Sequence, residues 1–308
     1  MSKLNQKLKR IGYSILPKQT YISILYRKWF GRWPNLRNPE RFTEKLFCLK
    51  VINEREFGAT IKQCYDKLNV RDYVVDKLGE EDAKNLLNEL YDVYDNVDDI
   101  EFDALPTKFV LKITQSSGGN IICPDKSALD IDEAKKKLKI WLERARSGEN
   151  KNTVAYEEAY VFDGHPRIIC EKFLEDSNGK IPSDIRVFCF NGEPKLFVID
   201  FGTTEESGEH GTHIVRNVYD LDWNLMDVNL GRPHDSNYVM EKPSNLDEII
   251  SISRKLSQDF YFVRVDLYNI DGALKFGELT WLPMGGRSVV TPDEYDFTFG
   301  SWLKIPSL

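Results

Sequence analysis

Two strand-like runs near the end of the 308-residue chain decide the fold: FVRVDLYN at residues 262–269 and ALKFGELT at residues 273–280. Alternation of apolar and polar residues is typical of half-buried strands, and the short segment between the runs predicts an antiparallel hairpin. Each strand carries one acid, Asp266 in the first and Glu278 in the second. We therefore expect these two carboxylates to be neighbours in one hairpin.

The length of the turn decides whether the two acids share a face of the sheet. A two-residue turn, Asp271-Gly272, would set Asp266 against Gly277 and turn Glu278 to the other face. A three-residue loop over 270–272 gives the glycine a left-handed position and sets Asp266 opposite Phe276, with Glu278 a same-face diagonal neighbour about 7–8 Å away. Two carboxylates so placed can share hard cations that hold phosphate oxygens. The alternative is a pair of solvated strand acids.

The rest of the chain alternates helical and strand-like segments. Strands are expected at 108–113, 121–123, 168–174, 185–190 and 195–201, and Asn191-Gly192 predicts a hairpin between the last two. Helices are expected at 66–78, 81–91 and 130–146 and from about Ser244 onward. This pattern predicts an α+β fold in which antiparallel strand pairs are flanked by helices.

A lysine on a predicted strand is followed by a glycine-containing loop. Lys112 lies in the strand, and residues 115–120 form the loop. Backbone amides of such a loop can point at phosphate oxygens, and the lysine adds positive charge. The loop matches neither of the common phosphate-binding glycine motifs. An ordinary flexible β-turn is the alternative interpretation.

A glutamate stands at the end of another apolar strand, in Glu171-Lys172-Phe173-Leu174. Its carboxylate could accept the exocyclic amine of adenine, and Asp184, ten residues after Leu174, could accept ribose hydroxyls. Taken singly, both signals are weak, because such tetrapeptides arise by chance and Asp184 could be a solvated loop acid.

Charge is distributed unevenly along the chain, whose net charge is -7. Residues 1–45 hold eleven Lys or Arg against two Glu, so that segment is +9 and the remainder is -16. The segment is also rich in aromatic residues, which suits either a helical cap with a solvated basic face or contact with an anionic membrane or polymer. The acidic remainder argues against nucleic acid as a partner.

No sequence feature indicates export or membrane insertion. No apolar run approaches the roughly 20 residues that span a bilayer, and the apolar stretch 11–16 is too short for a signal peptide. The five cysteines form no CxxC pair and suit reduced core positions. We therefore expect a cytoplasmic protein, with its basic N-terminus available for peripheral contact at the inner face of the membrane.

In this order the features resemble the ATP-grasp superfamily, and more narrowly the TupA-like ATP-grasp family of bacterial surface-polysaccharide gene clusters. The resemblance runs from about Pro39 to Gly286 and includes Pro39–Leu46, Asp66–Tyr73 and Lys275–Thr280. It implies an ATP-grasp fold, in which two α+β subdomains clasp ATP, preceded by a helical, basic N-terminal region. The implied divisions are a basic, aromatic-rich N-terminal helical region at 1–60, a helical segment at 61–107, the lid subdomain at 108–175, and the metal and acceptor subdomain at 176–308.

The resemblance also implies roles for single residues. Lys67 and Lys112 would touch the ATP phosphates, and the phosphate lid would comprise Ser116, Ser117, Gly118, Gly119 and Asn120. The adenine would be lined by Glu171, Lys172, Phe173 and Leu174, with Asp184 at the ribose and Arg186 also at the nucleotide. Asp266 and Glu278 would bind Mg²⁺. Many relatives have Asn where this chain has Thr280, whose hydroxyl can still offer an oxygen to the metal.

By resemblance, the reaction joins a carboxylate to an amine through an acyl phosphate. Lys112, Arg264 and Arg287 are the expected catalytic residues, and Arg186 and Arg216 are further candidates for binding the developing oxyanion. The family setting implies an acidic sugar, such as a uronic acid, or a polysaccharide precursor as one substrate and an amine or amino acid as the other, in capsular or cell-surface polysaccharide biosynthesis. The insertion 203–242 would bind the acceptor.

Three other functions stay open from the sequence. A glycosyltransferase would need a metal motif such as DxD, for which only the acidic stretches 91–95 and 98–99 qualify, and these are expected in helix or loop. A sugar kinase could use the same nucleotide fold without ligation. A non-catalytic binding module would have little use for a full set of ATP residues.

Overall fold

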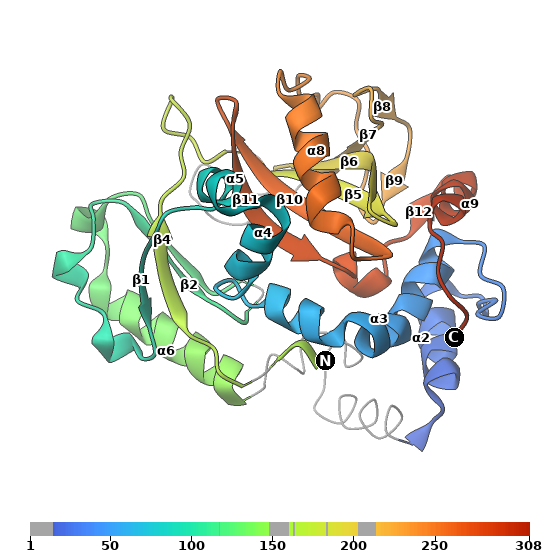
Figure 1. Cartoon of the computed structure of the whole chain (residues 1–308), viewed down its shortest axis with the longest axis horizontal. Helices are drawn as coiled ribbons and strands as arrows, with labels where there is room; N and C mark the ends of the chain where they lie inside the picture. The colour runs from blue at the N-terminus through green and yellow to red at the C-terminus, as the bar shows by residue number, and fades with distance from the viewer. Residues whose placement is uncertain (1–14, 117, 148–159, 163, 183, 203–213) are drawn as a thin grey trace. The chain divides into compact units, whose positions relative to one another are not determined.

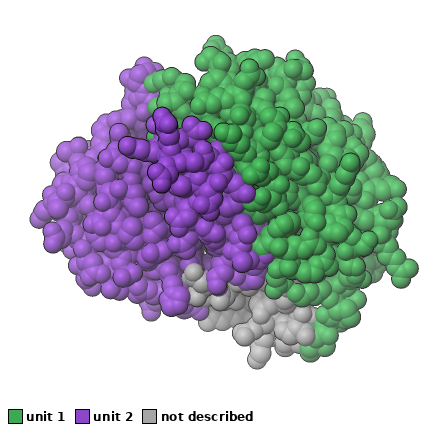
Figure 2. Space-filling model, viewed as in Figure 1, with its two compact units in different colours: residues 1–57, 183–308 green, residues 58–182 purple. Residues whose placement is uncertain are grey.

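The computed structural model describes residues 15–116, 118–147, 160–162, 164–182, 184–202 and 214–308. The chain forms two compact units, coloured separately in Figure 2: unit 1 comprises residues 1–57 and 183–308, and unit 2 comprises residues 58–182. Each unit contains its own antiparallel sheet and its own helices. The α+β class predicted from the sequence is therefore confirmed.

Unit 1 contains a six-stranded sheet in the order β11-β10-β5-β6-β7-β8 (Figure 1). All neighbouring strands in it are antiparallel. A separate pair joins β12 to β9. The strands are β5 (Asp184–Phe190), β6 (Glu193–Phe201), β7 (Val215–Tyr219), β8 (Leu225–Met226), β9 (Asn229–Leu230), β10 (Phe262–Ile270), β11 (Ala273–Thr280) and β12 (Val290–Thr291).

One face of this sheet is apolar where helix α8 covers it. Helix α8 (Leu246–Ser257) packs on β10, β5 and β6 (Figure 1). Strand residues that point to this side are buried, among them Val265, Val187 and Ile199. The alternation of apolar residues in each strand therefore places one complete apolar row under the helix.

The other face is apolar at one end only. There Phe42 of α3 (Phe42–Tyr65) packs its ring against Phe190 and Phe262, with ring centroids 5.5 and 5.2 Å apart. Helix α9 (Asp293–Trp302) adds Phe299 to the same cluster. Burying one such phenylalanine contributes about 1.5–3 kcal/mol. Further along the two strands, the same face carries charged side chains instead, Arg264 and Asp266 on β10 and Arg186 on β5.

The hairpin of β10 and β11 differs from the expected three-residue loop. Ile270 pairs with Ala273, so the turn is the two residues Asp271-Gly272, with φ values of 51° and 92°. These left-handed conformations are those of a two-residue type I′ turn, which an Asp-Gly pair favours.

A bulge at Gly277 nevertheless brings the two acids together. Leu267 pairs with Phe276, and Asp266 pairs directly with Glu278, so Gly277 is the extra residue. A Cβ on Gly277 would lie 2.9 Å from the backbone oxygen of Asp266, which only glycine avoids. Asp266 thus lies directly opposite Glu278, rather than opposite Phe276 with Glu278 on the diagonal.

Unit 2 contains a four-stranded antiparallel sheet in the order β1-β4-β2-β3. Helix α6 (Ile131–Ser147) covers one face, where Leu138 and Leu142 meet strand residues such as Leu111 and Cys170. The strands are β1 (Leu90–Tyr94), β2 (Phe109–Ile113), β3 (Asn120–Cys123) and β4 (Ile168–Lys172), and the other helices are α4 (Val70–Leu78) and α5 (Glu80–Leu86).

Strand β1 corrects the helix expected over residues 81–91. Helix α5 ends at Leu86, and residues 90–94 pair with β4 instead. The partner strand lies about eighty residues away in the chain, so local periodicity did not reveal this pairing.

The N-terminal region contributes helix α2 (Lys18–Phe30), which buries Tyr21, Ile22 and Tyr26. Tyr26 packs edge-on against Phe47 of α3, with ring centroids 5.1 Å apart. Residues 1–14, which hold four of the basic residues of the segment, lie outside the described part of the chain. In the described part of the chain, no helix combines the length and apolar character required to cross a membrane.

Candidate active site

A band of charged side chains crosses the α8-free face of the six-stranded sheet in unit 1. Pairing places Glu278, Asp266 and Arg186 side by side on β11, β10 and β5. Asp184 lies two residues before Arg186 at the start of β5, and Asp200 of β6 pairs with Arg216 of β7. Because cross-strand partners share a face, these charges form one continuous surface.

Arg264 joins the two acids that were predicted to bind metal. Its Nε donates to Oδ1 of Asp266 at 2.7 Å, and its Nη2 donates to Oδ2 of Asp266 at 2.6 Å and to Oε1 of Glu278 at 2.7 Å. Thr280 donates its hydroxyl to the same Glu278 oxygen at 2.9 Å. The structure thus brings together Arg264, Asp266, Glu278 and Thr280, four of the residues predicted from the sequence.

The surroundings of Asp266 make its charge costly. Burial, together with the charge of Glu278, raises the pKa of its carboxyl to about 7 against the lowering influence of Arg264. A cation between the two carboxylates would offset this cost. The site therefore has the electrostatic character of a place for positive charge.

The donor set also fits Mg²⁺. Magnesium is commonly held by one or two carboxylates together with substrate phosphates and water, and Asp266 and Glu278 supply two. Among the residues that the structure describes, no group of three or more acidic, histidine or cysteine side chains forms a complete metal cage. A cation here would need oxygens from a bound ligand, as phosphate would provide.

Next to the acid pair lies a cluster of arginines around Asp200. Arg216 donates to both oxygens of Asp200, at 2.6 and 2.7 Å, and Arg186 donates to one of them. Nη1 of Arg232, from the loop after β9, lies 3.2 Å from the same oxygen. Although burial alone would raise it, these arginines hold the pKa of Asp200 at about 2.

Arg186 connects this cluster to the acid pair. Its Nε donates to Asp184 at 2.7 Å and lies 3.8 Å from Oδ2 of Asp266. Burial lowers the pKa of Arg186, but the charges of Asp184, Asp200 and Asp266 outweigh burial and raise it. Asp184 and Arg186, both predicted at the nucleotide, therefore lie in the same charged band as the acid pair.

Arg287 lies apart from these contacts. Its Nε donates to the backbone oxygen of Met284 at 3.0 Å, and its guanidinium lies 4.9 Å from the ring centre of Trp29 on α2. It follows the short turn η5 (Pro283–Gly286), in which Met284, Gly285 and Gly286 all have positive φ. Of the two arginines expected to be catalytic, Arg264 thus contacts the acid pair, while Arg287 is held by the turn and by Trp29.

Unit 2 brings Lys112 and Glu171 together. Nζ of Lys112 lies 2.7 Å from Oε2 of Glu171, and Nη1 of Arg71 on α4 lies 3.4 Å from Oε1. Val110, two residues before Lys112, pairs with Glu171, so both charged side chains share the sheet face opposite α6. The residues predicted at the phosphates and at the adenine are thus direct partners here.

Lys67, just before α4, contacts the start of the glycine-containing loop. Its backbone N–H donates to the oxygen of Thr114 at 3.0 Å, and its Nζ donates to the oxygens of Ile113 and Ser116. The preceding Asp66 is buried and accepts from Gln115 at 3.0 Å, which ties the start of α4 to the loop.

The predicted phosphate lid follows directly. Gly118 and Gly119 have φ values of 85° and 72°, and Asn120 opens β3 opposite Lys112. Ser116 lies at the start of this loop, and Ser117 lies outside the described residues. A Cβ on Gly119 would lie 3.3 Å from the Ser116 hydroxyl, so the loop folds closely on itself.

The remaining adenine candidates follow Glu171 at the end of β4. Lys172 is exposed and lies 3.7 Å from Glu89, whereas Phe173 is buried and Leu174 half-buried. The backbone of Lys172 donates to Glu89 and accepts from Asn88. The segment thus places one apolar side chain inward and one charged side chain outward.

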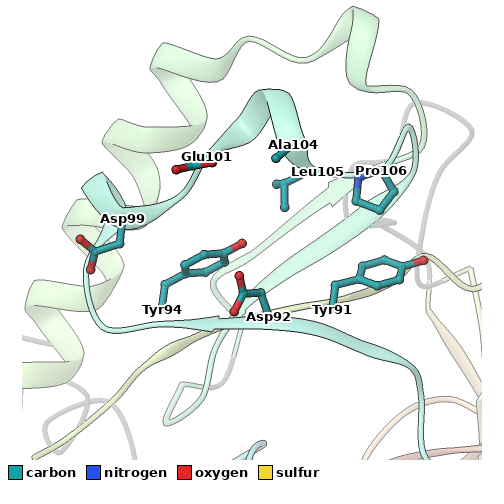
Figure 3. A pocket seen from close by; sticks show the side chains of 8 residues that line it. All are labelled: Tyr91, Asp92, Tyr94, Asp99, Glu101, Ala104, Leu105 and Pro106. Carbon is teal, nitrogen blue, oxygen red and sulfur yellow. The ribbon is translucent and has the colours of Figure 1, made fainter.

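The acidic stretch considered for a glycosyltransferase lines a pocket in unit 2 (Figure 3). Asp92 and Tyr94 point from β1 toward the short turns η1 (Val97–Asp99) and η2 (Phe102–Ala104). The pocket has a volume of about 530 Å³ and is lined by Tyr91, Asp92, Tyr94, Asp99, Glu101, Ala104, Leu105 and Pro106. Asp92 pairs with Cys170, so it lies on the α6 side of the sheet, away from Lys112 and Glu171.

Two residues of the arginine cluster were missed by the sequence interpretation. Asp200 is the one acid in the apolar run 196–201. Because a buried charge needs a partner, this position could have identified it as a candidate site residue. Arg232 lies in a short loop before Pro233, and no local pattern distinguishes it from an ordinary surface arginine.

Comparison with known proteins agrees with the expected fold. A family model described as TupA-like ATPgrasp matches residues 44–304. The comparison with curated proteins gives no match.

Solved structures of ligases are also similar in outline. A D-alanine–D-alanine ligase from Bacillus anthracis is 17% identical, with a TM-score of 0.41, over 74% of this chain and 60% of that one. An L-amino acid ligase from Bacillus licheniformis is 12% identical, with a TM-score of 0.44, over 91% of this chain and 55% of that one. The chain thus spans less than two thirds of the length of either structure.

Proposed function

The chain belongs to the TupA-like ATP-grasp family, and from this premise we propose that it is an ADP-forming ligase that joins a carboxylate to an amine. The observation that carries the proposal is the acid pair Asp266 and Glu278, directly opposed on one sheet face and bridged by Arg264. Two carboxylates and a guanidinium at one point suit the handling of ATP phosphates and of an acid substrate.

The proposed reaction has two steps. An oxygen of the substrate carboxylate attacks the γ-phosphorus of ATP, the bond to the β-phosphate oxygen breaks, and ADP leaves. The amine nitrogen then attacks the carbonyl carbon of the acyl phosphate, inorganic phosphate leaves, and the amine gives up its proton to solvent or phosphate. Such chemistry depends on positioning and charge neutralisation more than on a protein nucleophile.

The residues of unit 1 divide these tasks. Asp266 and Glu278 would hold Mg²⁺, which when bound neutralises the charge of the phosphate oxygens. Arg264 places its guanidinium beside both acids and would bind the oxyanion that develops on the substrate. Thr280 keeps one Glu278 oxygen oriented through its 2.9 Å hydrogen bond. Asp184 and Arg186 would meet the nucleotide at the neighbouring strand.

The residues of unit 2 would bind the nucleotide. Lys112 and Lys67 would meet phosphate oxygens, and the loop from Ser116 through Ser117 to Asn120 would offer backbone amides to them. In the structure Lys112 neutralises Glu171 at 2.7 Å. We propose that ATP binding exchanges this ion pair for contacts of Lys112 with phosphate and of Glu171 with the adenine amine.

The substrate pair is proposed from the family setting. We propose an acidic sugar, such as a uronic acid, or a polysaccharide precursor as the acid, and an amine or amino acid as the nucleophile, in capsular or cell-surface polysaccharide biosynthesis. The proposed place of action is the cytoplasm, with the basic N-terminal segment available for the inner face of the membrane.

A product assay tests the proposal. The protein is incubated with ATP, Mg²⁺, a panel of uronic acids and a mixture of amines, and ADP and free phosphate are both followed. A ligase releases both products only when acid and amine are present together. ADP without free phosphate would instead identify a sugar kinase, and no use of ATP with any acid would refute the ligase and leave the glycosyltransferase.

A further inference from the structure

Three arginines converge on the single buried carboxylate of Asp200, whose residue is 7% exposed. The guanidinium of Arg216 donates one hydrogen bond to each oxygen of this carboxylate, at 2.6 and 2.7 Å. Arg186 donates to the same group and also to Asp184. Arg232 lies 3.2 Å from an oxygen that Arg216 and Arg186 already occupy.

The backbone holds Arg232 in this position. The backbone N–H of Arg216 donates to the oxygen of Pro233 at 2.8 Å, and Nη1 of Arg216 donates to the oxygen of Leu230 at 3.1 Å. On the other side, Gly231 donates to the oxygen of Val289 at 2.9 Å. The loop that carries Arg232 is thus fixed at both of its ends, which places the guanidinium beside Asp200 before any ligand arrives.

This arrangement sets three guanidiniums around the one carboxylate of Asp200. Two further acids lie near Arg186: Asp184, which pairs with it, and Asp266, which lies 3.8 Å from it and also pairs with Arg264. Nη1 of Arg232 is buried and lies 3.2 Å from Oδ2 of Asp200 as an ion pair, without forming a hydrogen bond to any described residue. Burial lowers the pKa of Arg232, and repulsion from Arg216 and Arg186 lowers it further, against the attraction of Asp200. An external anion would give this nitrogen the hydrogen bond that it does not make to Asp200.

The arginine cluster lies next to the acid pair. Arg186 contacts Asp200 with one nitrogen and lies 3.8 Å from Asp266 with another. All of these side chains belong to unit 1 and to the same face of its sheet. An anion at Arg232 would therefore be separated from the proposed phosphate site at Asp266 only by the side chains of Asp200 and Arg186.

We propose that Arg232, supported by Arg216, binds the carboxylate of the acid substrate. The assignment rests on the proposed ligase function and adds to it the residue that selects an acid over a neutral sugar. The planar guanidinium fork matches a carboxylate in shape.

Direct binding measurements test this assignment. Galacturonate and glucuronate are titrated calorimetrically into the wild-type chain, with and without a saturating, non-hydrolysable ATP analogue and Mg²⁺. Galactose and glucose are the uncharged control sugars, and galactose 1-phosphate tests whether a phosphate binds in place of the carboxylate. The variant is Arg232→Met, with Arg232→Lys as the conservative replacement. Arg254→Met is the matched control, because Arg254 pairs with Glu193 on the surface.

We expect at least one uronate to bind the wild type and Arg254→Met equally well and to bind Arg232→Met about tenfold or more weakly. Arg232→Lys should lie between them, because it keeps the charge but loses the fork. Binding of the ATP analogue should be the same in all four proteins. Circular dichroism confirms that each variant is folded.

Several results would overturn the assignment. The first is that Arg232→Met binds the uronates as tightly as the wild type does. The second is that the wild type binds galactose as tightly as a uronate, or binds galactose 1-phosphate more tightly. The third is that the wild type binds no uronate while the ATP analogue is bound. Failure of the ATP analogue to bind the wild type would instead refute the proposed function. The uronate titrations without the analogue would then still decide whether Arg232 binds the carboxylate.

Discussion

The two sheets use their faces in the same way but to different extents. In unit 2, α6 covers an apolar face, and the opposite face carries one compact group in which Lys112 and Arg71 meet Glu171. In unit 1, α8 covers an apolar face, and the opposite face carries charges on five neighbouring strands. The first group has one acid for two cations, whereas the second alternates acids and arginines across the sheet.

The difference shows what each surface tolerates. Glu171 has two basic partners, so removal of one leaves its charge compensated. The side chains of Asp200 and Asp266 are 1% and 6% exposed, against 8% for Glu171, and each depends on arginines that other acids share. Removal of one charged side chain should therefore affect several neighbouring charged groups in the band of unit 1, but only its direct partners in unit 2.

The largest effect is expected from the acid pair of unit 1. Asp266→Asn or Glu278→Gln should lower ATP-dependent turnover by roughly 10³-fold, because each removes a carboxylate proposed to hold the cation at the phosphates. Turnover is measured as ADP release with the accepted acid and amine. Asp271→Asn, in the turn of the same hairpin, is the control and should keep wild-type activity. Retained turnover in either acid variant would disprove the metal assignment.

Removal of the acid at the centre of the arginine cluster comes second. Asp200→Asn should destabilise the chain by about 3 kcal/mol at pH 7, because three partly or fully buried guanidiniums lose their counter-charge. The folded-state pKa of Asp200, about 2, lies below the usual 3.8. Its contribution to stability is therefore present above about pH 4 and is lost as the pH falls toward 2.

The stability gap between wild type and Asp200→Asn should accordingly narrow by roughly 2 kcal/mol between pH 5 and pH 2. Urea denaturation at several pH values measures it. A gap that stays constant with pH would mean that Asp200 does not carry its charge in the folded chain.

A smaller loss is expected from the lysine of unit 2. Lys112→Met should lower kcat/KM for ATP by about 10²-fold, because one charged donor to the phosphates is removed. The stability of the chain should change little, since Arg71 still faces Glu171. Lys108→Met is the control, because Lys108 pairs with Glu175 on the surface just before the same strand. Equal kinetics for the two lysine variants would remove Lys112 from the nucleotide site.

The bulge of the hairpin should show the smallest effect. Gly277→Ala places a methyl group 2.9 Å from the backbone oxygen of Asp266 and should cost about 1–3 kcal/mol of unfolding free energy. Gly58 lies in helix α3, and a methyl group added there meets no atom within 4 Å. Gly58→Ala should therefore leave the free energy of unfolding unchanged or raise it. Equal urea midpoints for the two variants would show that the close contact at Gly277 relaxes without cost.

Much of the fold could be predicted because its signals are local. The helix expected over 130–146 is α6, and the side chain of Asp130 accepts from the N–H of Glu133 at 2.9 Å as a helix cap should. The Asn191-Gly192 turn joins β5 to β6 as expected. Strand β1 was missed because its partner, β4, is distant in the chain and supplies the pairing that residues 90–94 lack by themselves.

The site was predicted in its residue types but not in its geometry. Asp266 and Glu278 stand out as acids in apolar strands, but their register was wrong, because a close backbone approach at Gly277 determines it. Arg264 was identified by its parity with Asp266, which is a local property. Asp200 and Arg232 were overlooked, since their importance comes from contacts between segments that are separated along the chain.

By itself, the sequence determined helix α6, the strands of the β5–β6 and β10–β11 hairpins, the acids of the final hairpin and the family of the chain. Strand alternation, helix caps and a family pattern are properties of neighbouring residues. Only the tertiary structure decided that Asp266 lies directly opposite Glu278 and that three arginines meet at Asp200. Pairing between strands and the closure of a loop depend on the shape of the whole sheet. No window of sequence contains that shape.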